Sequence, residues 1–507
     1  MIKKYWHTLK YLKPIQILYR LHNKFISSKF KEYNSVSYKP INLFIDGLHN
    51  DTEYLKRFEY KNGYVKILNE DVKLDYKDLK HYSPLIQYNI QYFEYGIVWA
   101  QKGIKFEEFK EKWKEYIDAN LPLQPYVISL QIPNIIIAMN IYGVDDQEMY
   151  DNLYSRYKWL LKHQEKHLLA NHYFENIKAI VIASYVFNDD NIFEKYIKLL
   201  EKECKEEILD DGVHFELSMM YHKLILEDLL LIKKIYSSKL IDEKIEKMTN
   251  AVISIEDGMN RTPLFNDAGD NVSKSKNAFL KVLGDKELII NNEFKDSGYY
   301  KLKKNNISLL IDAGLVGPNY NPGHAHCDCL SFEVFKDCKA VFVNSGTYQY
   351  QGSKRSVLRS TKSHNTIMID NHEQSEVWGE HRVARRIKNV QGKLLNDSFE
   401  GSYNNYLGEK HTRYIELQDN YIKVLDEIKA KEGLEVKSFL HLSPEYNYDN
   451  NCIIGNGDKI IINNINSEMI ISESEYSSEF GKIEKNICLI FKWKSDENKH
   501  GYEIKFL

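Results

Sequence analysis

Histidine residues stand beside amide, hydroxyl and carboxyl side chains in several segments of this sequence, and such groups are suited to acid–base chemistry. The segment NHYFEN combines Asn171, His172 and Glu175. If it begins a helix, residues three and four positions apart lie on one side of the first turn, where backbone N–H groups face anions. Helix capping, with Asn171 as the N-cap and Glu175 as a first-turn acid, explains the same residues equally well.

The segment DGVHFELSMMYHKLILEDLL places Tyr221 and His222 within an apolar helical pattern. A tyrosine in such a pattern is usually a core residue whose hydroxyl group needs one partner. It becomes an acid or a base only where burial and positive neighbours change its pKa. Both interpretations stay open from this segment alone.

The segment PGHAHCDCLSFEV contains His324, His326 and Asp328 at alternate positions. Alternate residues of a β-strand point to the same face. We therefore expect a strand that presents these side chains to a metal ion or a catalytic pocket. The alternative is a pair of solvated histidines in a loop after a Pro-Gly turn.

Residues 351–390 are locally basic, with eight Lys and Arg residues against four Asp and Glu residues. The planar guanidinium group of Arg matches carboxylate and sulfate groups. This segment therefore predicts contact with an acidic ligand, and its alternative is a solvated charged surface.

The spacing of apolar residues predicts helices from about residue 80 to residue 280, with short polar connections at 188–190 and 210–212. Such short connections indicate a stack of helical hairpins. After about residue 285, β-rich runs such as CLSFEVF and YIKVLDEI alternate with Asn, Asp and Gly, which predicts an antiparallel β domain. We expect an α+β multidomain protein with a helical domain at 1–285, its residues 1–60 an extension packed on it, and a β domain at 286–507.

The composition is that of a folded protein, with 507 residues of which 43% are apolar and 28% charged. A net charge of −3 argues against nucleic-acid binding through overall charge, and six cysteines without paired motifs fit a reducing compartment. We expect no signal peptide and no transmembrane segment, so the predicted location is the cytoplasm. The basic N-terminus predicts either a helix docked on its own domain or a helix at the inner face of the membrane.

Six motifs in this order resemble the heparinase II/III and alginate-lyase superfamily of polysaccharide lyases: NHYFEN, DGVHFELSMMYH, FNDAGD, GHAHCDCLSFEV, VNSGTYQY and STKSHNTIMIDNHEQSEVWGEHRVARR. The opening WHTLKYLKPIQILYRL and the segment LIQYNIQYFEY are similar to members found beside bacterial surface-polysaccharide genes. The resemblance implies an incomplete α/α toroid followed by an antiparallel β-sandwich. It also implies an acidic polysaccharide as the partner, bound in the cleft between them.

The implied reaction is β-elimination at a uronic acid. A base removes the C5 proton, and an acid protonates the 4-O leaving group. The neutralised carboxylate stabilises the negative charge that develops. By similarity, Asn171, His172 and Glu175 neutralise the carboxylate, and Tyr221 and His324 serve as acid and base. The substrate-binding residues that we predict are Asn89, Tyr92, His222, Tyr348, Arg355, Arg359, Arg382 and Arg386.

Metal-containing relatives bind zinc at three positions that correspond here to His326, Asn344 and His364. Asn344 stands where those relatives have a carboxylate, and a neutral amide is a weak zinc ligand. We therefore expect no required cofactor, at most weak binding of zinc or another divalent metal, and Asp328 as a compensating ligand.

Three functions are compatible with these residues. The first is a lyase, and the second is a uronyl C5-epimerase, which uses the same proton abstraction but leaves the chain intact. The third is a catalytically silent glycan-binding protein. The retained Asn, His and Tyr side chains favour an enzyme, and we rank the lyase first.

Overall fold

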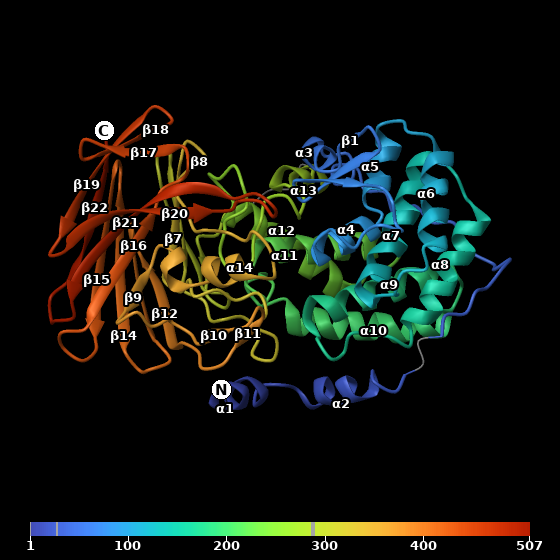
Figure 1. Cartoon of the computed structure of the whole chain (residues 1–507), viewed down its shortest axis with the longest axis horizontal. Helices are drawn as coiled ribbons and strands as arrows, with labels where there is room; N and C mark the ends of the chain where they lie inside the picture. The colour runs from blue at the N-terminus through green and yellow to red at the C-terminus, as the bar shows by residue number, and fades with distance from the viewer. Residues whose placement is uncertain (1, 27–28, 285–288) are drawn as a thin grey trace.

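The computed structural model describes residues 2–26, 29–284 and 289–507. A helical domain and a β domain lie side by side, and the first two helices run along one edge of the molecule (Figure 1). This order of helices and sheets confirms the predicted fold class. The predicted domain boundary at 285/286 lies outside the described residues, between α13 (Lys276–Leu283) and β4 (Glu293–Phe294).

The helical domain is organised around α9 (Ala170–Val186), in which only His172 and Tyr185 are not buried. Helix α9 is central because it packs against α7 (Pro125–Tyr142), α8 (Gln147–Leu160), α10 (Asp190–Glu207) and α11 (Met219–Lys233). The other helices of this half are α3 (Thr52–Lys56), α4 (Pro84–Gln91), α5 (Tyr95–Gln101), α6 (Phe106–Asp118) and α12 (Lys239–Ile255).

Helix α7 is long and apolar enough to cross a membrane by length and composition. Its 18 residues are 61% buried inside the protein, which is the pattern of a core helix. It ends at Gly143, whose φ of 67° is the left-handed conformation that commonly terminates a helix.

The β domain consists of antiparallel sheets that enclose a common apolar core containing Leu309, Ile415 and Leu489. An eight-stranded sheet has the order β12-β13-β14-β15-β22-β19-β18-β17, a four-stranded sheet the order β20-β21-β16-β9, and a five-stranded sheet the order β4-β5-β6-β7-β8. The strands are β5 (Tyr299–Lys304), β6 (Ile307–Asp312), β7 (Phe332–Lys336), β8 (Lys339–Phe342), β9 (Ile367–Ile369), β12 (Lys388–Leu395), β13 (Ser398–Asn404), β14 (Lys410–Gln418), β15 (Tyr421–Lys429), β16 (Glu435–His441), β17 (Tyr446–Asp449), β18 (Cys452–Gly455), β19 (Asp458–Ile465), β20 (Glu468–Tyr476), β21 (Glu484–Lys494) and β22 (His500–Phe506).

Smaller elements complete the chain. The hairpin sheet β1 (Tyr60–Lys61), β2 (Tyr64–Ile67) and β3 (Glu70–Lys73) lies within the helical half, where we expected no strand. The basic segment contributes α14 (Ser353–Leu358), a short 3₁₀ helix (Thr361–Ser363), β10 (Val377–Trp378) and β11 (Arg382–Val383).

The expected strand through His324, His326 and Asp328 is wrong, because this segment is irregular and β7 begins only at Phe332. Its backbone bonds to other loops instead of a sheet neighbour: the His326 N–H donates to Asn266 Oδ1 over 3.1 Å, and the Cys327 N–H to the Arg359 carbonyl over 3.0 Å. The three side chains therefore need not share one face.

The N-terminal strap, residues 2–26, contains α1 (Ile2–Leu9) and α2 (Pro14–His22). It contacts the helical domain, on which we expected residues 1–60 to pack, and it also contacts the β domain. Tyr5 packs edge-on against the Trp378 ring of the β domain, with ring centroids 4.8 Å apart. Gln16 Nε2 donates to the carbonyl of Leu168 in the helical domain over 3.2 Å.

Candidate active site

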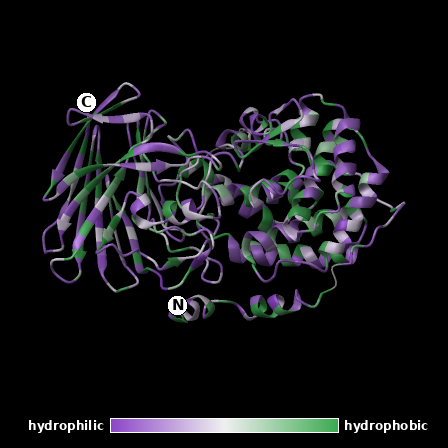
Figure 2. Cartoon of the chain, viewed as in Figure 1, coloured by the Kyte–Doolittle hydropathy of each residue, from purple (hydrophilic) through white to green (hydrophobic). Residues whose placement is uncertain are grey.

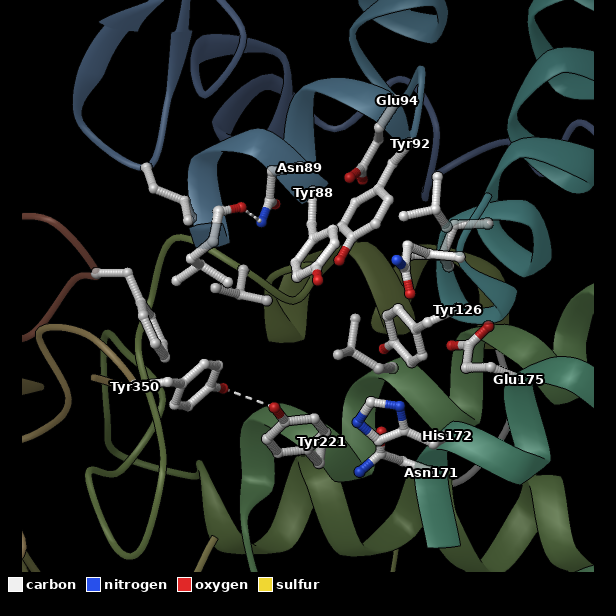
Figure 3. A pocket seen from close by; sticks show the side chains of 18 of the residues that line it. Tyr88, Asn89, Tyr92, Glu94, Tyr126, Asn171, His172, Glu175, Tyr221 and Tyr350 are labelled. Atoms are coloured by element: carbon white, nitrogen blue, oxygen red, sulfur yellow. Dashed lines mark hydrogen bonds between the residues drawn. The ribbon is translucent and has the colours of Figure 1, made fainter. Parts of the chain in front are cut away.

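A pocket of about 600 Å³ lies where the helical domain meets the β domain. The helices contribute Asn89, Tyr92 and Tyr126 together with α9 and α11 side chains, and the β domain contributes Tyr350 (Figure 3). The predicted catalytic set is brought together here, since all five of its members line the pocket: Asn171, His172, Glu175, Tyr221 and His324. Their catalytic roles stay predictions.

A strained backbone turn positions the first turn of α9 at the pocket. Leu169 and Ala170 have φ values of 63° and 51°, a region that residues other than glycine enter rarely and that tends to occur at functional sites. Leu169 is the N-cap residue and makes no side-chain cap bond. The capping interpretation of Asn171 is therefore wrong, and the Asn171 side chain is used for other contacts.

The Asn171 amide is fixed by a buried carboxylate. Asn171 Nδ2 donates to both carboxylate oxygens of Glu216, each over 2.9 Å, and lies 3.2 Å from His324 Nε2. A carboxylate accepts hydrogen bonds only, so Glu216 determines that the amide nitrogen of Asn171 faces it.

His172 is the cationic candidate of the pocket. Its Nδ1 lies 3.1 Å from Glu165 Oε1, and its ring packs against Tyr126 with centroids 4.7 Å apart. Burial lowers the pKa of His172, but the Glu165, Glu216 and Glu175 carboxylates more than offset this, so the pKa is raised above its usual value.

Glu175 is already paired inside the protein. The Lys178 ammonium group binds Glu175 and also lies 2.7 Å from Asp228 Oδ1, with all three residues buried. Burial and the Glu175 charge raise the pKa of Asp228 well above its usual value. Glu175 therefore holds Lys178 at the pocket wall, which differs from the predicted role of neutralising a substrate carboxylate directly.

Tyr221 lies in the first turn of α11, where Ser218 caps the helix by accepting the Tyr221 N–H. Its hydroxyl group is 2.6 Å from that of Tyr350 (Figure 3), and its ring is 4.0 Å from the His324 ring by centroid. Burial, with a contribution from Tyr350, raises the pKa of Tyr221 well above its usual value. Tyr221 is therefore protonated at neutral pH, so its hydroxyl group carries a proton that it could donate.

Asp267 orients the His324 ring. His324 Nδ1 lies 2.9 Å from Asp267 Oδ2, and a carboxylate requires a donor at that distance. Nδ1 therefore carries the hydrogen of the neutral ring, and Nε2 keeps its lone pair, as a general base requires. Arg355 forms a buried ion pair with Asp267, and this charge outweighs burial and holds the pKa of Asp267 well below its usual value.

His326, Asp328 and His364 form a buried cluster whose potential ligand atoms lie within 4.8 Å of one another. His326 Nε2 faces Asp267 Oδ1 at 2.8 Å and His364 Nδ1 faces Asn344 Oδ1 at 3.2 Å, so each ring is oriented from its far side. With hydrogens on these far nitrogens, the near nitrogens, His326 Nδ1 and His364 Nε2, would each keep a lone pair, and they lie 3.2 Å apart. Two facing lone pairs beside a carboxylate suit a divalent cation.

This geometry corrects the predicted metal set. Asp328 takes the place of Asn344, whose amide oxygen supports His364 from its far side. A divalent cation held there would neutralise Asp328 and fix the His326 ring. It would have a structural role, because the three cluster residues are absent from the pocket lining among the described residues.

Of the predicted substrate-binding residues, Asn89 and Tyr92 line the pocket. His222 does not: it is fully buried, with Nε2 2.9 Å from the Met248 carbonyl. Tyr348 is also outside the lining, and Tyr350, two residues later in the same motif, takes that place.

The four predicted arginines are outside the lining as well, within the described chain. Arg355 is paired with Asp267, and Arg359 donates to the Ala325 and Glu380 carbonyls. Arg386 donates to Asn319, and Arg382 lies over the Trp378 ring. Arg355, Arg359 and Arg386 are buried and bind partners inside the protein, which argues against substrate contact. Arg382 is exposed, and its substrate role stays a prediction.

Most of the site residues that the sequence analysis missed hold or orient the predicted catalytic side chains. Asp267 belongs to the FNDAGD motif, which carried a resemblance but no assigned role. Glu165 precedes the NHYFEN motif, and Glu216 lies inside the DGVHFELSMMYH motif, where no spacing distinguished it. Tyr126, Tyr350 and His381 add to the pocket wall from three separate segments.

The fold and the site together define a class of protein. A helical-hairpin domain and an antiparallel β-sandwich meet at an aromatic pocket that holds His172 with a raised pKa, His324 oriented by Asp267, and the hydroxyl group of Tyr221. This is a toroid-and-sandwich protein equipped for proton transfer on a ligand of oligosaccharide size.

Comparison with known proteins identifies the family. Residues 146–289 match the sequence model of the heparinase II/III N-terminus, and residues 290–501 match that of the heparinase II/III-like C-terminal domain. The two models together span well over half of the chain. The chain belongs to the heparinase II/III-like family of polysaccharide lyases, as its motifs predicted.

Individual relatives are distant in sequence. The chain is 23% identical over 261 residues to the heparin-sulfate lyase of Pedobacter heparinus, covering 41% of this chain and 38% of that protein's length. A heparinase III structure has a TM-score of 0.69 at 16% identity, with 97% of this chain and 91% of that chain covered. A mutant of heparan sulfate lyase HepC from Pedobacter heparinus has a TM-score of 0.60 at 17% identity, with 97% and 88% covered. These structures establish a shared fold.

Proposed function

We propose that this protein is a lyase that cleaves a uronic-acid-containing acidic polysaccharide by β-elimination. The observation that carries the proposal is the contact between the His324 ring, which Asp267 orients through Nδ1, and the ring of Tyr221. A base and an acid thus lie side by side in one pocket, which this reaction requires.

Substrate binding places the uronate carboxylate at the start of α9. There the raised pKa of His172 favours a positive charge, and the Asn171 side chain lies beside it with its amide nitrogen held by Glu216. Neutralising the carboxylate makes the C5 proton more acidic, because the negative charge that develops on its removal spreads onto the carboxylate oxygens. The tyrosines of the pocket wall offer apolar faces to the sugar rings.

In the elimination, one proton is removed from C5 and one is given to the departing oxygen. His324 Nε2 takes the C5 proton, the electron pair of the C5–H bond forms the C4–C5 double bond, and the C4–O4 bond breaks. The Tyr221 hydroxyl group protonates the departing oxygen. Asp267 stabilises the imidazolium ion that His324 becomes.

A link to bacterial surface polysaccharides is part of the same proposal. It is supported by the similarity of the opening segment to family members found beside such genes, and by the distant likeness to a heparin-sulfate lyase.

The test is to incubate the purified protein with a panel of uronate polymers and to follow ultraviolet absorbance of the unsaturated uronate product. Absorbance that rises with one polymer class supports the lyase and identifies its substrate. Solvent deuterium entering C5 without chain cleavage would instead show an epimerase. Binding of a polymer with neither signal would show a silent glycan-binding protein.

A further inference from the structure

The N-terminal strap exposes its apolar side chains to solvent. Trp6, Leu18 and Phe25 are 66%, 61% and 85% exposed. Single exposed apolar residues are normal on protein surfaces, but nine of the twenty large ones found in the described chain fall within residues 2–25. We call the following set the outer stripe: Ile2, Trp6, Leu9, Ile17, Leu18, Leu21 and Phe25.

The outer stripe follows helical spacing. Residues 2, 6 and 9 recur at intervals of four and three along α1, and residues 17, 21 and 25 recur at intervals of four along α2 and its continuation. Positions so spaced lie on one face of a helix. Each helix therefore presents one continuous apolar face, and both helices run along the same edge of the molecule (Figure 1).

The inward contacts of the strap are mainly polar, with Tyr5 and Tyr11 as the aromatic exceptions that face Trp378 and Arg386. Helix α1 has no buried residue, and Gln16 is the only buried residue of α2. Gln16 donates to the Leu168 and Tyr320 carbonyls, and Thr8 Oγ1 accepts from Trp378 Nε1 over 3.1 Å. A helix that merely docks on its own protein buries its apolar face. Docking therefore explains the inner face of the strap but leaves the outer stripe without a function.

Positive charge accompanies the outer stripe. Residues 1–31 contain eight Lys and Arg residues and no Asp or Glu residue, in a chain whose net charge is −3. Lys3, Lys10, Arg20 and Lys24 are exposed on the same two helices (or directly after them), and Figure 2 shows hydrophobic residues next to hydrophilic ones there. Apolar and aromatic side chains flanked by Lys and Arg are the pattern of a helix that lies in a membrane interface.

We propose that the N-terminal strap docks this protein on an anionic phospholipid surface. The outer stripe enters the boundary between headgroups and acyl chains, and the exposed Lys and Arg side chains bind lipid phosphates. An acidic polysaccharide would satisfy the charges but would not require exposed Ile and Leu side chains. A second copy of the chain would bring a second set of eight positive charges against the first, which disfavours self-association. The proposal does not depend on the proposed lyase activity.

The experiment is cosedimentation of the full chain with vesicles of phosphatidylcholine mixed with phosphatidylglycerol, compared with vesicles of phosphatidylcholine alone. We expect binding to the anionic vesicles that weakens as salt is added. The triple variant Trp6→Ser, Leu18→Ser, Phe25→Ser and the quadruple variant Lys3→Gln, Lys10→Gln, Arg20→Gln, Lys24→Gln should each lose about tenfold or more in vesicle binding. The second loss follows because each Lys or Arg near an anionic surface adds roughly fivefold.

Matched controls are available in the β domain. Leu407, Ile454 and Ile471 are 46%, 47% and 50% exposed, and their triple Ser variant should bind vesicles like the unmodified chain. The quadruple Gln variant of Lys393, Lys429, Lys482 and Lys485 controls for charge. Equal thermal unfolding temperatures of the strap variants and the unmodified chain show that the strap variants fold.

Several outcomes would overturn the proposal. These are no sedimentation with anionic vesicles, equal sedimentation with neutral ones, or full binding by both strap variants. A dimer in sedimentation velocity that the strap variants abolish, without vesicle binding, would assign the outer stripe to a second copy. Retention on immobilised heparin that depends on the strap, again without vesicle binding, would assign it to an acidic glycan.

Discussion

Tyr221 and His324 lie in ring contact, yet the structure gives them opposite protonation states at their reactive atoms. We predict that Tyr221→Phe and His324→Ala each lower turnover of the cleaved polymer about 10²- to 10⁴-fold, the usual contribution of a general acid or base. The unfolding temperature should change little. Tyr348→Phe is the matched control, because Tyr348 lies outside the pocket lining. Near-normal turnover by either variant would remove that residue from the mechanism.

The charge of His172 predicts how kcat/KM depends on pH. The folded protein raises the pKa of this imidazole, so the protonated form that neutralises a carboxylate is present below the raised pKa and is lost as pH rises through it. Glu165→Gln removes the nearest anion and leaves burial, which lowers the pKa. The alkaline limb of kcat/KM should therefore move to lower pH. Glu148→Gln, an exposed carboxylate beside Lys110, should leave the limb in place; an unmoved limb in Glu165→Gln would show that His172 does not set it.

The metal cluster can be tested by elemental analysis after dialysis against zinc. Asp328→Asn removes the only carboxylate of the cluster and should lower zinc content. Asn344→Asp should raise it, because a carboxylate at His364 Nδ1 strengthens that histidine as a ligand from behind. Zinc content that Asp328→Asn leaves unchanged would contradict the corrected ligand set.

Helix α11 makes the position of Tyr221 depend on its cap. Ser218 accepts the Tyr221 N–H and donates to the Asp267 carbonyl over 2.6 Å, so it joins the helix to the segment that orients His324. Ser238 caps α12 in the same way but is remote from the pocket lining. Ser218→Ala and Ser238→Ala should each cost about 0.5–2 kcal/mol of stability, as N-cap losses do.

Only Ser218→Ala should also lower kcat. The measurements are kcat and the thermal unfolding temperature of both variants. Equal kcat in both variants would show that the cap stabilises α11 without placing Tyr221.

Among the helices and strands, the sequence predicted those whose apolar residues have a regular spacing. Helix α9 and the short connection before α10 follow from apolar residues at helical intervals. The segment around His326 was predicted wrongly because its backbone partners, Asn266 and Arg359, are distant in sequence and invisible to local pattern. The sequence pattern does not show which of Tyr348 and Tyr350 faces the pocket, because that depends on the conformation of the turn that contains them.

The whole molecule assembles the pocket from segments that lie far apart in the chain. The motif residues could be found in the sequence because each has a distinctive side chain. The supporting contacts could not: Asp267 reaches His324 and Arg355 across 57 and 88 positions. The basic segment predicted ligand-binding arginines, but Arg355 and Arg359 are buried. Their guanidinium groups bind a carboxylate and carbonyl groups inside the protein.

The N-terminal strap touches both domains and none of its residues lines the pocket. Deleting residues 1–26 removes one aromatic pair, a few hydrogen bonds, the ion pairs of Lys4 and Lys13, and cation–π contacts such as that of Arg386 with Tyr11. Each of these contacts is worth about 0–1.5 kcal/mol. Part of this is offset by the chain entropy that is regained. The unfolding temperature should therefore fall by a few degrees, since about 1 kcal/mol corresponds to roughly 2–4 °C in domains of this size. Turnover of a soluble polymer should persist.

A shorter deletion of residues 1–12 keeps the Gln16 contacts with the helical domain and loses the Trp378 contact with the β domain. It should lower the unfolding temperature by less than the longer deletion does. Differential scanning calorimetry with a parallel turnover assay measures both effects. Loss of turnover in the shorter deletion, at a temperature where the protein stays folded, would show that the strap also sets the relative position of the two domains and thereby the geometry of the pocket between them.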